Sequence, residues 1–147
     1  MKSLLLKYFK GCLLLATLPC LFLALTSFKE GEKDTIIIGT GGGFSGQVTM
    51  YTIDYKGNVF KESGLKDETK QFGKISKKEL SLIKMEIKKS GFYEQTLREP
   101  GNIYYYIETV FKGRNHKVTW GKEQNDSSEK MQQLYKFILD IISKSKK

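Results

Sequence analysis

The sequence contains few of the residues that most often carry chemistry, since it has two cysteines and one histidine. Both cysteines, Cys12 and Cys20, lie near the start of the chain, so a domain built from the rest has no disulfide, thiolate metal ligand or cysteine nucleophile. The single histidine, His116, has no neighbouring cluster that could form a zinc site, and we interpret it as a surface residue of a strand. We therefore expect a domain held together by packing, with no metal and no other cofactor.

Acidic residues are missing from the first 28 positions, where Lys2, Lys7 and Lys10 precede an uncharged, apolar run from Gly11 to Phe28. This pattern is typical of a secretory signal peptide, and the run is also just long enough for an N-terminal membrane anchor that is not removed. We predict that residues 1–28 form one or the other and that 29–34 form a charged spacer. Residues 35–147 then make a single exported domain, which is periplasmic, extracellular or membrane-anchored.

Cys20 has two interpretations. It could be the lipidated first residue of a lipoprotein, but Thr17-Leu18-Pro19 fits the lipoprotein pattern poorly and the apolar run continues beyond the cysteine. The favoured interpretation is a hydrophobic residue of the leader, with lipidation as the alternative.

The exported part is basic. The chain has 25 basic and 16 acidic residues, and residues 1–28 hold three of the basic ones, so 22 − 16 leaves a net charge of +6. Spread-out lysines favour a solvated surface, and the alternative is contact with anionic envelope polymers or head groups. An exported protein is not expected to bind nucleic acid.

A glycine-rich stretch, Gly41-x-Gly43-x-x-Gly46, matches the dinucleotide-binding motif in its letters. That motif binds a pyrophosphate only where the glycines leave a strand and open a helix. Here the following residues, Gln47 to Tyr55, are rich in β-branched and aromatic types and predict a strand. The glycines are therefore expected to join two strands.

Hydrophobic periodicity and turn residues predict the fold. Capping boxes at Ser76–Glu79 and Asp126–Glu129 each precede an apolar face at helical spacing, so they predict two helices. Gly64–Ile75 and Glu94–Asn102 are interpreted as loops. Strands are predicted at Thr35–Gly39, Gln47–Asp54, Asn58–Ser63, Ile103–Phe111 and His116–Gly121. We therefore predict an α+β fold in the order β-ββ-α-ββ-α, with an antiparallel sheet of four to five strands and two helices packed on one face.

Catalytic patterns are not recognised in the sequence. There is no G-x-S-x-G elbow, Ser45 has no identifiable base, and the paired carboxylates lie in polar stretches typical of a solvated surface. We predict that the protein is not an enzyme.

Two stretches are candidate binding sites for a partner protein. One is the glycine-rich tip, formed by Gly42, Gly43, Phe44 and Ser45, and the other is the exposed sheet face with Tyr104 and Tyr106. For the tyrosines, cross-strand packing is the favoured alternative. The same face is expected to carry Glu108, Lys117 and Thr119.

Several of these features together resemble a known family. They are Gly42-Gly-Phe-x-Gly46 before a hairpin, a helix ending at Gly91-Phe92, a tyrosine-rich strand, His116-Lys-Val-Thr119 and a terminal amphipathic helix. This pattern, over residues 36–142, resembles the emfourins, small bacterial inhibitors of thermolysin-like zinc proteases. It is similar, too, to uncharacterised small exported bacterial proteins with the same glycine-rich start and Thr-Trp-Gly end.

The resemblance implies a non-catalytic module that binds a secreted protease or another envelope protein. The alternative is an envelope-associated structural protein or lipoprotein that binds anionic surface polymers, with membrane contact through the N-terminal segment if that segment is not cleaved.

Overall fold

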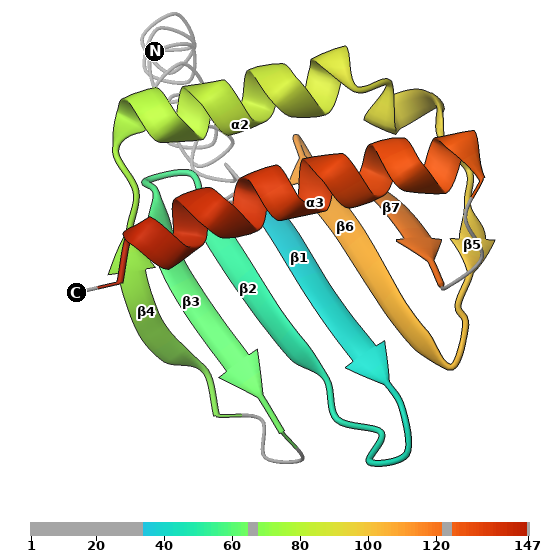
Figure 1. The fold of residues 1–147 in the computed structure, drawn as a ribbon. Helices are drawn as coiled ribbons and strands as arrows, with labels where there is room; N and C mark the ends of the chain where they lie inside the picture. The colour runs from blue at the N-terminus through green and yellow to red at the C-terminus, as the bar shows by residue number, and fades with distance from the viewer. Residues whose placement is uncertain (1–33, 65–67, 122–124, 147) are drawn as a thin grey trace, which may run out of the picture. The chain divides into compact units, whose positions relative to one another are not determined.

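The computed structural model describes residues 34–64, 68–121 and 125–146 (Figure 1). The predicted leader, including Cys20, and the predicted spacer up to residue 33 lie outside these residues. Within the three described ranges, no helix is long and apolar enough to cross a membrane.

The described residues form a seven-stranded sheet in the order β4-β3-β2-β1-β6-β7-β5. All neighbouring strands are antiparallel except β5 and β7, which are parallel. The α+β class is confirmed, whereas the prediction of an antiparallel sheet of four to five strands is wrong because the sheet is larger and mixed. The strands are β1 (Thr35–Gly42), β2 (Thr49–Asp54), β3 (Asn58–Ser63), β4 (Lys70–Lys74), β5 (Arg98–Glu99), β6 (Ile103–Phe111) and β7 (Arg114–Trp120).

The two additional strands lie in segments predicted to be loops. β4 pairs with β3 as Lys-Gln-Phe-Gly-Lys, which has a single large apolar residue and so gives no period-two signal. Lysines are typical of an edge strand, where they discourage pairing with another chain. β5 has only two residues, and it forms because the loop before β6 passes alongside Thr119 and Trp120.

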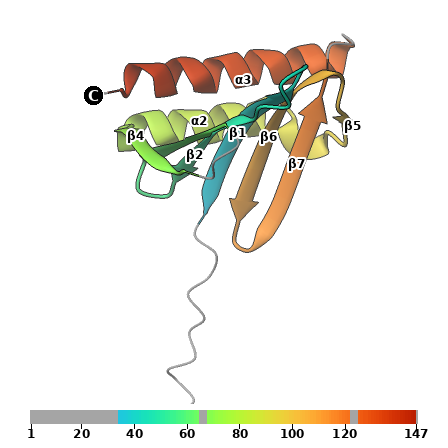
Figure 2. The same ribbon diagram turned by 90° about the horizontal axis from the view of Figure 1, so that it is seen from below.

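Both helices cover the same face of the sheet (Figures 1 and 2). α2 (Lys77–Lys89) begins at Ser76, whose hydroxyl accepts the Glu79 N–H while the Glu79 carboxylate accepts the Ser76 N–H, so the first capping box is confirmed. After α2, Gly91 adopts φ +72°, and a short 3₁₀ turn, η1 (Phe92–Glu94), follows.

α3 (Asp126–Lys144) also begins with a capping box, but one residue earlier than predicted. Asn125 is the cap, and it exchanges hydrogen bonds with Ser128 at 2.8 Å in each direction. Asn125 has an extended backbone suited to a cap, and Asp126 is already in the first turn, where its charge favours the helix dipole.

The core lies between the helices and the central strands. Ile38 of β1 and Ile107 of β6 are register partners, and both are buried. The helices contribute apolar stripes to the same core, with Trp120 of β7 almost fully buried beside them. The buried helical residues are Leu80, Ile83, Ile87, Met131, Leu134, Tyr135, Ile138, Ile141 and Ile142.

We call the opposite side of the sheet the open face, because neither helix covers it (Figure 2). Strand alternation and register place Gly39, Gly41, Tyr104, Tyr106, Glu108, Lys117 and Thr119 there, which agrees with the face predicted for the last five.

The two ends of the sheet differ in what they carry. We call one the α2 end: α2 lies across it, beside Asp34 and the turns Tyr55–Gly57 and Phe111–Gly113 (Figure 1). The Lys112 N–H donates to the Asp34 carboxylate at 3.0 Å, which joins two of these segments. The other, the loop end, carries the connection from β1 to β2, residues 43–48, which we call the glycine loop.

Candidate functional site

The glycine loop is fastened at its base to the segment that leads into β6. Gly42 and Gly43 have φ angles of +93° and +73°, a region that residues with a Cβ rarely adopt. A Cβ on Gly42 would lie 2.1 Å from the Asn102 carbonyl oxygen, and the Gly43 N–H donates to that oxygen at 2.6 Å. The glycines therefore allow a close backbone approach that fixes where the loop starts.

Phe44 follows this fixed base, and its side chain is fully exposed. Ile103, which is 51% exposed, is the side chain nearest to the Cβ position of Gly43, at 3.9 Å. A loop whose base is already fixed loses less conformational freedom on binding than a free loop, and buried aromatic anchors carry much of the energy of protein interfaces.

Ser45 contributes to the loop itself, because its hydroxyl accepts a hydrogen bond from the Gln47 N–H at 3.5 Å. The glycine motif lies between two antiparallel strands, as predicted, so its amides are not at the N-terminus of a helix. This arrangement offers no helix dipole to a pyrophosphate.

The two tyrosines of the open face lie over glycines of β1. Register pairs Tyr106 with Gly39 and Tyr104 with Gly41. A Cβ on Gly39 would be 2.4 Å from Cζ of Tyr106, and a Cβ on Gly41 would be 2.6 Å from the Tyr104 hydroxyl. The rings therefore occupy space that β1 side chains would otherwise fill.

Tyr106 is buried although no helix covers it. Its hydroxyl donates to the Met50 sulfur at 3.4 Å, and the Lys117 ammonium lies 4.3 Å from its ring centroid. Lys117 also pairs with Glu108 at 3.1 Å. Burial, with the nearby Glu108 carboxylate as a smaller cause, raises the pKa of Tyr106 to about 12.

The two stretches predicted separately are brought together at the loop end. Tyr104 is next to Ile103 in β6, and Ile103 pairs with Gly42 at the base of the glycine loop. Tyr104 is half-buried and Tyr106 is only 6% exposed. Of the residues predicted to bind, Phe44 and Tyr104 are therefore accessible, whereas Tyr106 is buried beside Tyr104 on the open face, with the two ring centroids 6.4 Å apart.

His116 is not the surface residue that the sequence predicts. It is half-buried on the helix-covered face, where its Nε2 is 3.0 Å from the Phe92 carbonyl oxygen. Its ring makes an edge contact with Phe92 at a centroid distance of 4.9 Å. Within the described part of the chain, no three histidine, cysteine or carboxylate side chains form a metal-binding group.

A small apolar pocket of about 180 Å³ opens at the α2 end, between α2 and the first residues of β1. The Thr109 side chain lines it, and its hydroxyl is buried with no hydrogen-bond partner in the structure. Sequence reasoning missed this pocket because its lining comes from segments far apart in the chain. The only local signal is that Tyr55 and Phe111, at the two turns, are each followed by lysine.

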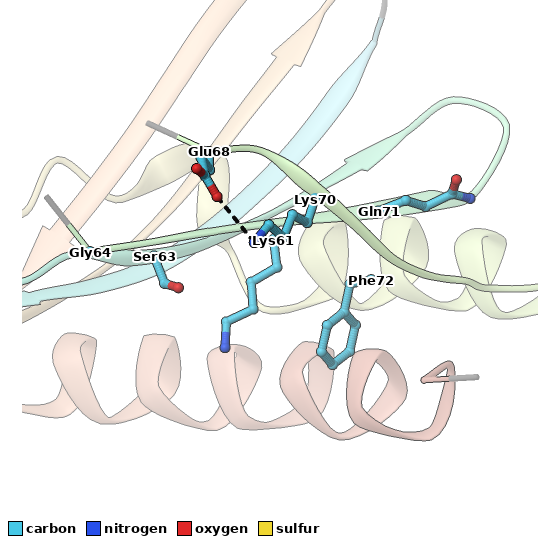
Figure 3. Close-up of a pocket in the computed structure, with 7 residues that line it drawn as sticks. All are labelled: Lys61, Ser63, Gly64, Glu68, Lys70, Gln71 and Phe72. Carbon is cyan, nitrogen blue, oxygen red and sulfur yellow. Dashed lines mark ion pairs between the residues drawn. The ribbon is translucent and has the colours of Figure 1, made fainter. Parts of the chain in front are cut away.

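A more polar hollow of about 470 Å³ lies between β3 and β4 (Figure 3). Lys61 and Phe72 both point from the sheet toward α3, and Lys70 pairs with Glu68 at 3.1 Å. Both members of this ion pair are largely exposed, so it contributes little to stability. We assign no ligand to this hollow.

No protein-family model matches the sequence, and a comparison with curated proteins found no similar protein.

Proposed function

We propose that this domain is a small exported, non-catalytic module that binds a partner protein through the glycine loop and Tyr104. The observation that carries the proposal is the fully exposed Phe44 on a loop whose base is fixed by the hydrogen bond from Gly43 to Asn102. Tyr104 pairs with Gly41 on the open face near the base of this loop, and Ile103, on the opposite side of β6, is the side chain nearest to Gly43. Aromatic residues are enriched at the centre of protein interfaces, where a few of them supply most of the binding energy.

The emfourin resemblance suggests the kind of partner, a secreted thermolysin-like zinc protease. The test is to titrate the purified protein into such a protease and to measure residual activity. Inhibition should be stoichiometric, and Phe44→Ala should weaken it by at least about 30-fold, the equivalent of roughly 2 kcal/mol at an anchor residue. Leu82→Ala is the matched control, because Leu82 is also exposed but lies on α2.

Two results would count against the proposal. Absence of inhibition across the secreted proteases of the same source would remove the protease as partner. Equal inhibition by the parent and the Phe44→Ala protein would remove the glycine loop as the binding site.

The second candidate function is an envelope-associated structural role, favoured by the net charge of +6 carried by residues 29–147 (22 − 16). Attraction to anionic cell-wall polymers would weaken as salt rises toward about 1 M, where the Debye length falls to roughly 3 Å. Apolar binding at the glycine loop would survive that salt. Salt-sensitive retention on cell-wall material, without inhibition of any protease, would favour the structural role.

A further inference from the structure

The α2 end exposes aromatic side chains and places cations beside two of them. Tyr55, Tyr93 and Phe111 are 45%, 48% and 43% exposed. The Lys56 ammonium lies 5.4 Å from the Tyr55 ring centroid, and the Lys84 ammonium lies 5.7 Å from that of Phe111. Aromatic rings flanked by long basic side chains are typical of surfaces at the boundary between water and lipid head groups.

The charge of this end is positive. Around the pocket and the two turns, five basic residues face the carboxylates of Asp34 and Asp54, both of which already accept backbone hydrogen bonds. Asp34 accepts from the Lys112 N–H at 3.0 Å, and Asp54 accepts from the Lys56 N–H at 2.8 Å. The basic residues here are Lys56, Lys84, Lys88, Lys112 and Arg114. The rest of α2 and η1 adds Lys77, Lys78 and Lys89 against Glu79, Glu86 and Glu94, so the excess of three basic residues is unchanged.

The apolar pocket opens within this same surface. Tyr55, Tyr93 and Phe111 all line it, together with Lys84 and Lys88, so aromatic and basic residues of this surface form part of its wall. The chain reaches this end at Asp34, shortly after the apolar run that finishes at Phe28. The surface and the apolar run are thus close together along the sequence.

We propose that the α2 end docks on the surface of a bilayer that contains anionic phospholipids. Tyr55, Tyr93 and Phe111 lie at the level of the head groups, and the basic residues contact lipid phosphates. This orientation directs the glycine loop, at the other end of the sheet, away from the lipid. The inference does not depend on the proposed partner of the glycine loop, and the two can fail separately.

The test uses the full chain on vesicles and measures hydrogen–deuterium exchange of the turns Tyr55–Gly57 and Phe111–Gly113. One set of vesicles contains phosphatidylcholine alone, and the other contains phosphatidylcholine with phosphatidylglycerol. The full chain is suitable because the same protein is used with both sets, so that only the lipid composition differs. Both turns should exchange more slowly on the anionic vesicles, and about 1 M salt should reverse the effect. Exchange in the glycine loop should be the same on both.

A charge-reversal pair locates the surface. Lys56→Glu with Lys84→Glu should lower the ratio of docked to undocked domain by at least about 25-fold, since each basic residue near an anionic surface contributes about fivefold. Lys130→Glu with Lys136→Glu makes the same charge change on exposed positions of α3, and it should leave the protection of both turns in place.

Three results would overturn the proposal. These are equal exchange of the turns on both vesicle types, equal loss of protection in both charge-reversal proteins, and equal protection by soluble polyphosphate without vesicles. If the protein with Lys56→Glu and Lys84→Glu does not fold, the exchange of the parent chain on the two vesicle types and at high salt still tests the proposal.

Discussion

The ring of Tyr106 occupies the place of a side chain at Gly39, since a Cβ there would lie 2.4 Å from its Cζ atom. These two residues are register partners in the central strands β1 and β6. Glycine weakens a strand because its backbone is flexible and it has no side chain to pack. An aromatic ring from the neighbouring strand can cover the glycine and compensate for this loss of stability. The pair explains how the open face buries a tyrosine without a helix above it.

This contact predicts that Gly39→Ala destabilises the domain by about 1–3 kcal/mol, because the new methyl group overlaps a ring that is itself packed. Urea unfolding followed by Trp120 fluorescence measures the change. In a Tyr106→Ala background the same substitution should cost much less, since the ring is gone. An equal cost in both backgrounds would show that the ring is not the cause.

The pKa of Tyr106 and that of Tyr135 are both raised from 10.0 to about 12, in each case chiefly by burial. Between about pH 10 and 12 the folded protein holds protons that the unfolded chain releases, so stability is complete below about pH 10 and falls as pH rises. Urea unfolding at a series of pH values measures the decline. It should be shallower in Tyr106→Phe and shallowest in Tyr106→Phe with Tyr135→Phe; an unchanged slope in the double variant would contradict the assignment.

Thr109 has a buried hydroxyl without a hydrogen-bond partner in the structure. Thr109→Val keeps the shape and removes the desolvated group, so it should raise the free energy of unfolding by about 1 kcal/mol. Thr119 is half-buried on the open face, and Thr119→Val should change the free energy of unfolding by less than about 0.5 kcal/mol. A loss of stability in Thr109→Val would indicate that a bound molecule or water satisfies the hydroxyl in solution.

The start of α3 gives a prediction that separates two neighbouring residues. Asn125→Ala removes the cap and should cost about 0.5–2 kcal/mol, whereas Asp126→Ala removes only a charge near the helix dipole and should cost less, about 0.3–1 kcal/mol. Thermal and urea unfolding of both variants measure the difference. If Asp126→Ala cost more stability than Asn125→Ala, Asp126 would be the cap, as the sequence predicts.

Much of the fold could be predicted because local signals agree with tertiary packing. Short motifs in the sequence mark the glycine turns at Gly57 and Gly113 and the capping box at Ser76. β4 and β5 could not be predicted, since their residues have no strand pattern and their pairing depends on neighbours that the chain supplies elsewhere.

Less of the candidate site could be predicted. The exposure of Phe44 follows from its place in a glycine-rich loop, but the burial of Tyr106 depends on which β1 residue it faces. That register is set by two strands far apart in the sequence. The surface at the α2 end was missed for the same reason, because its residues come from two turns, a helix and the start of β1.

One contact at the edge of the sheet links it to the end of the described chain. Lys146, just beyond α3, forms a β-bridge with Gly73 of β4, and a Cβ on Gly73 would lie 2.2 Å from the Ser145 carbonyl oxygen. An edge strand in an incomplete sheet can pair with another chain. During synthesis from the amino end, β4 therefore lacks this bridge until Lys146 has emerged, and until then its outer edge is free to pair with another chain.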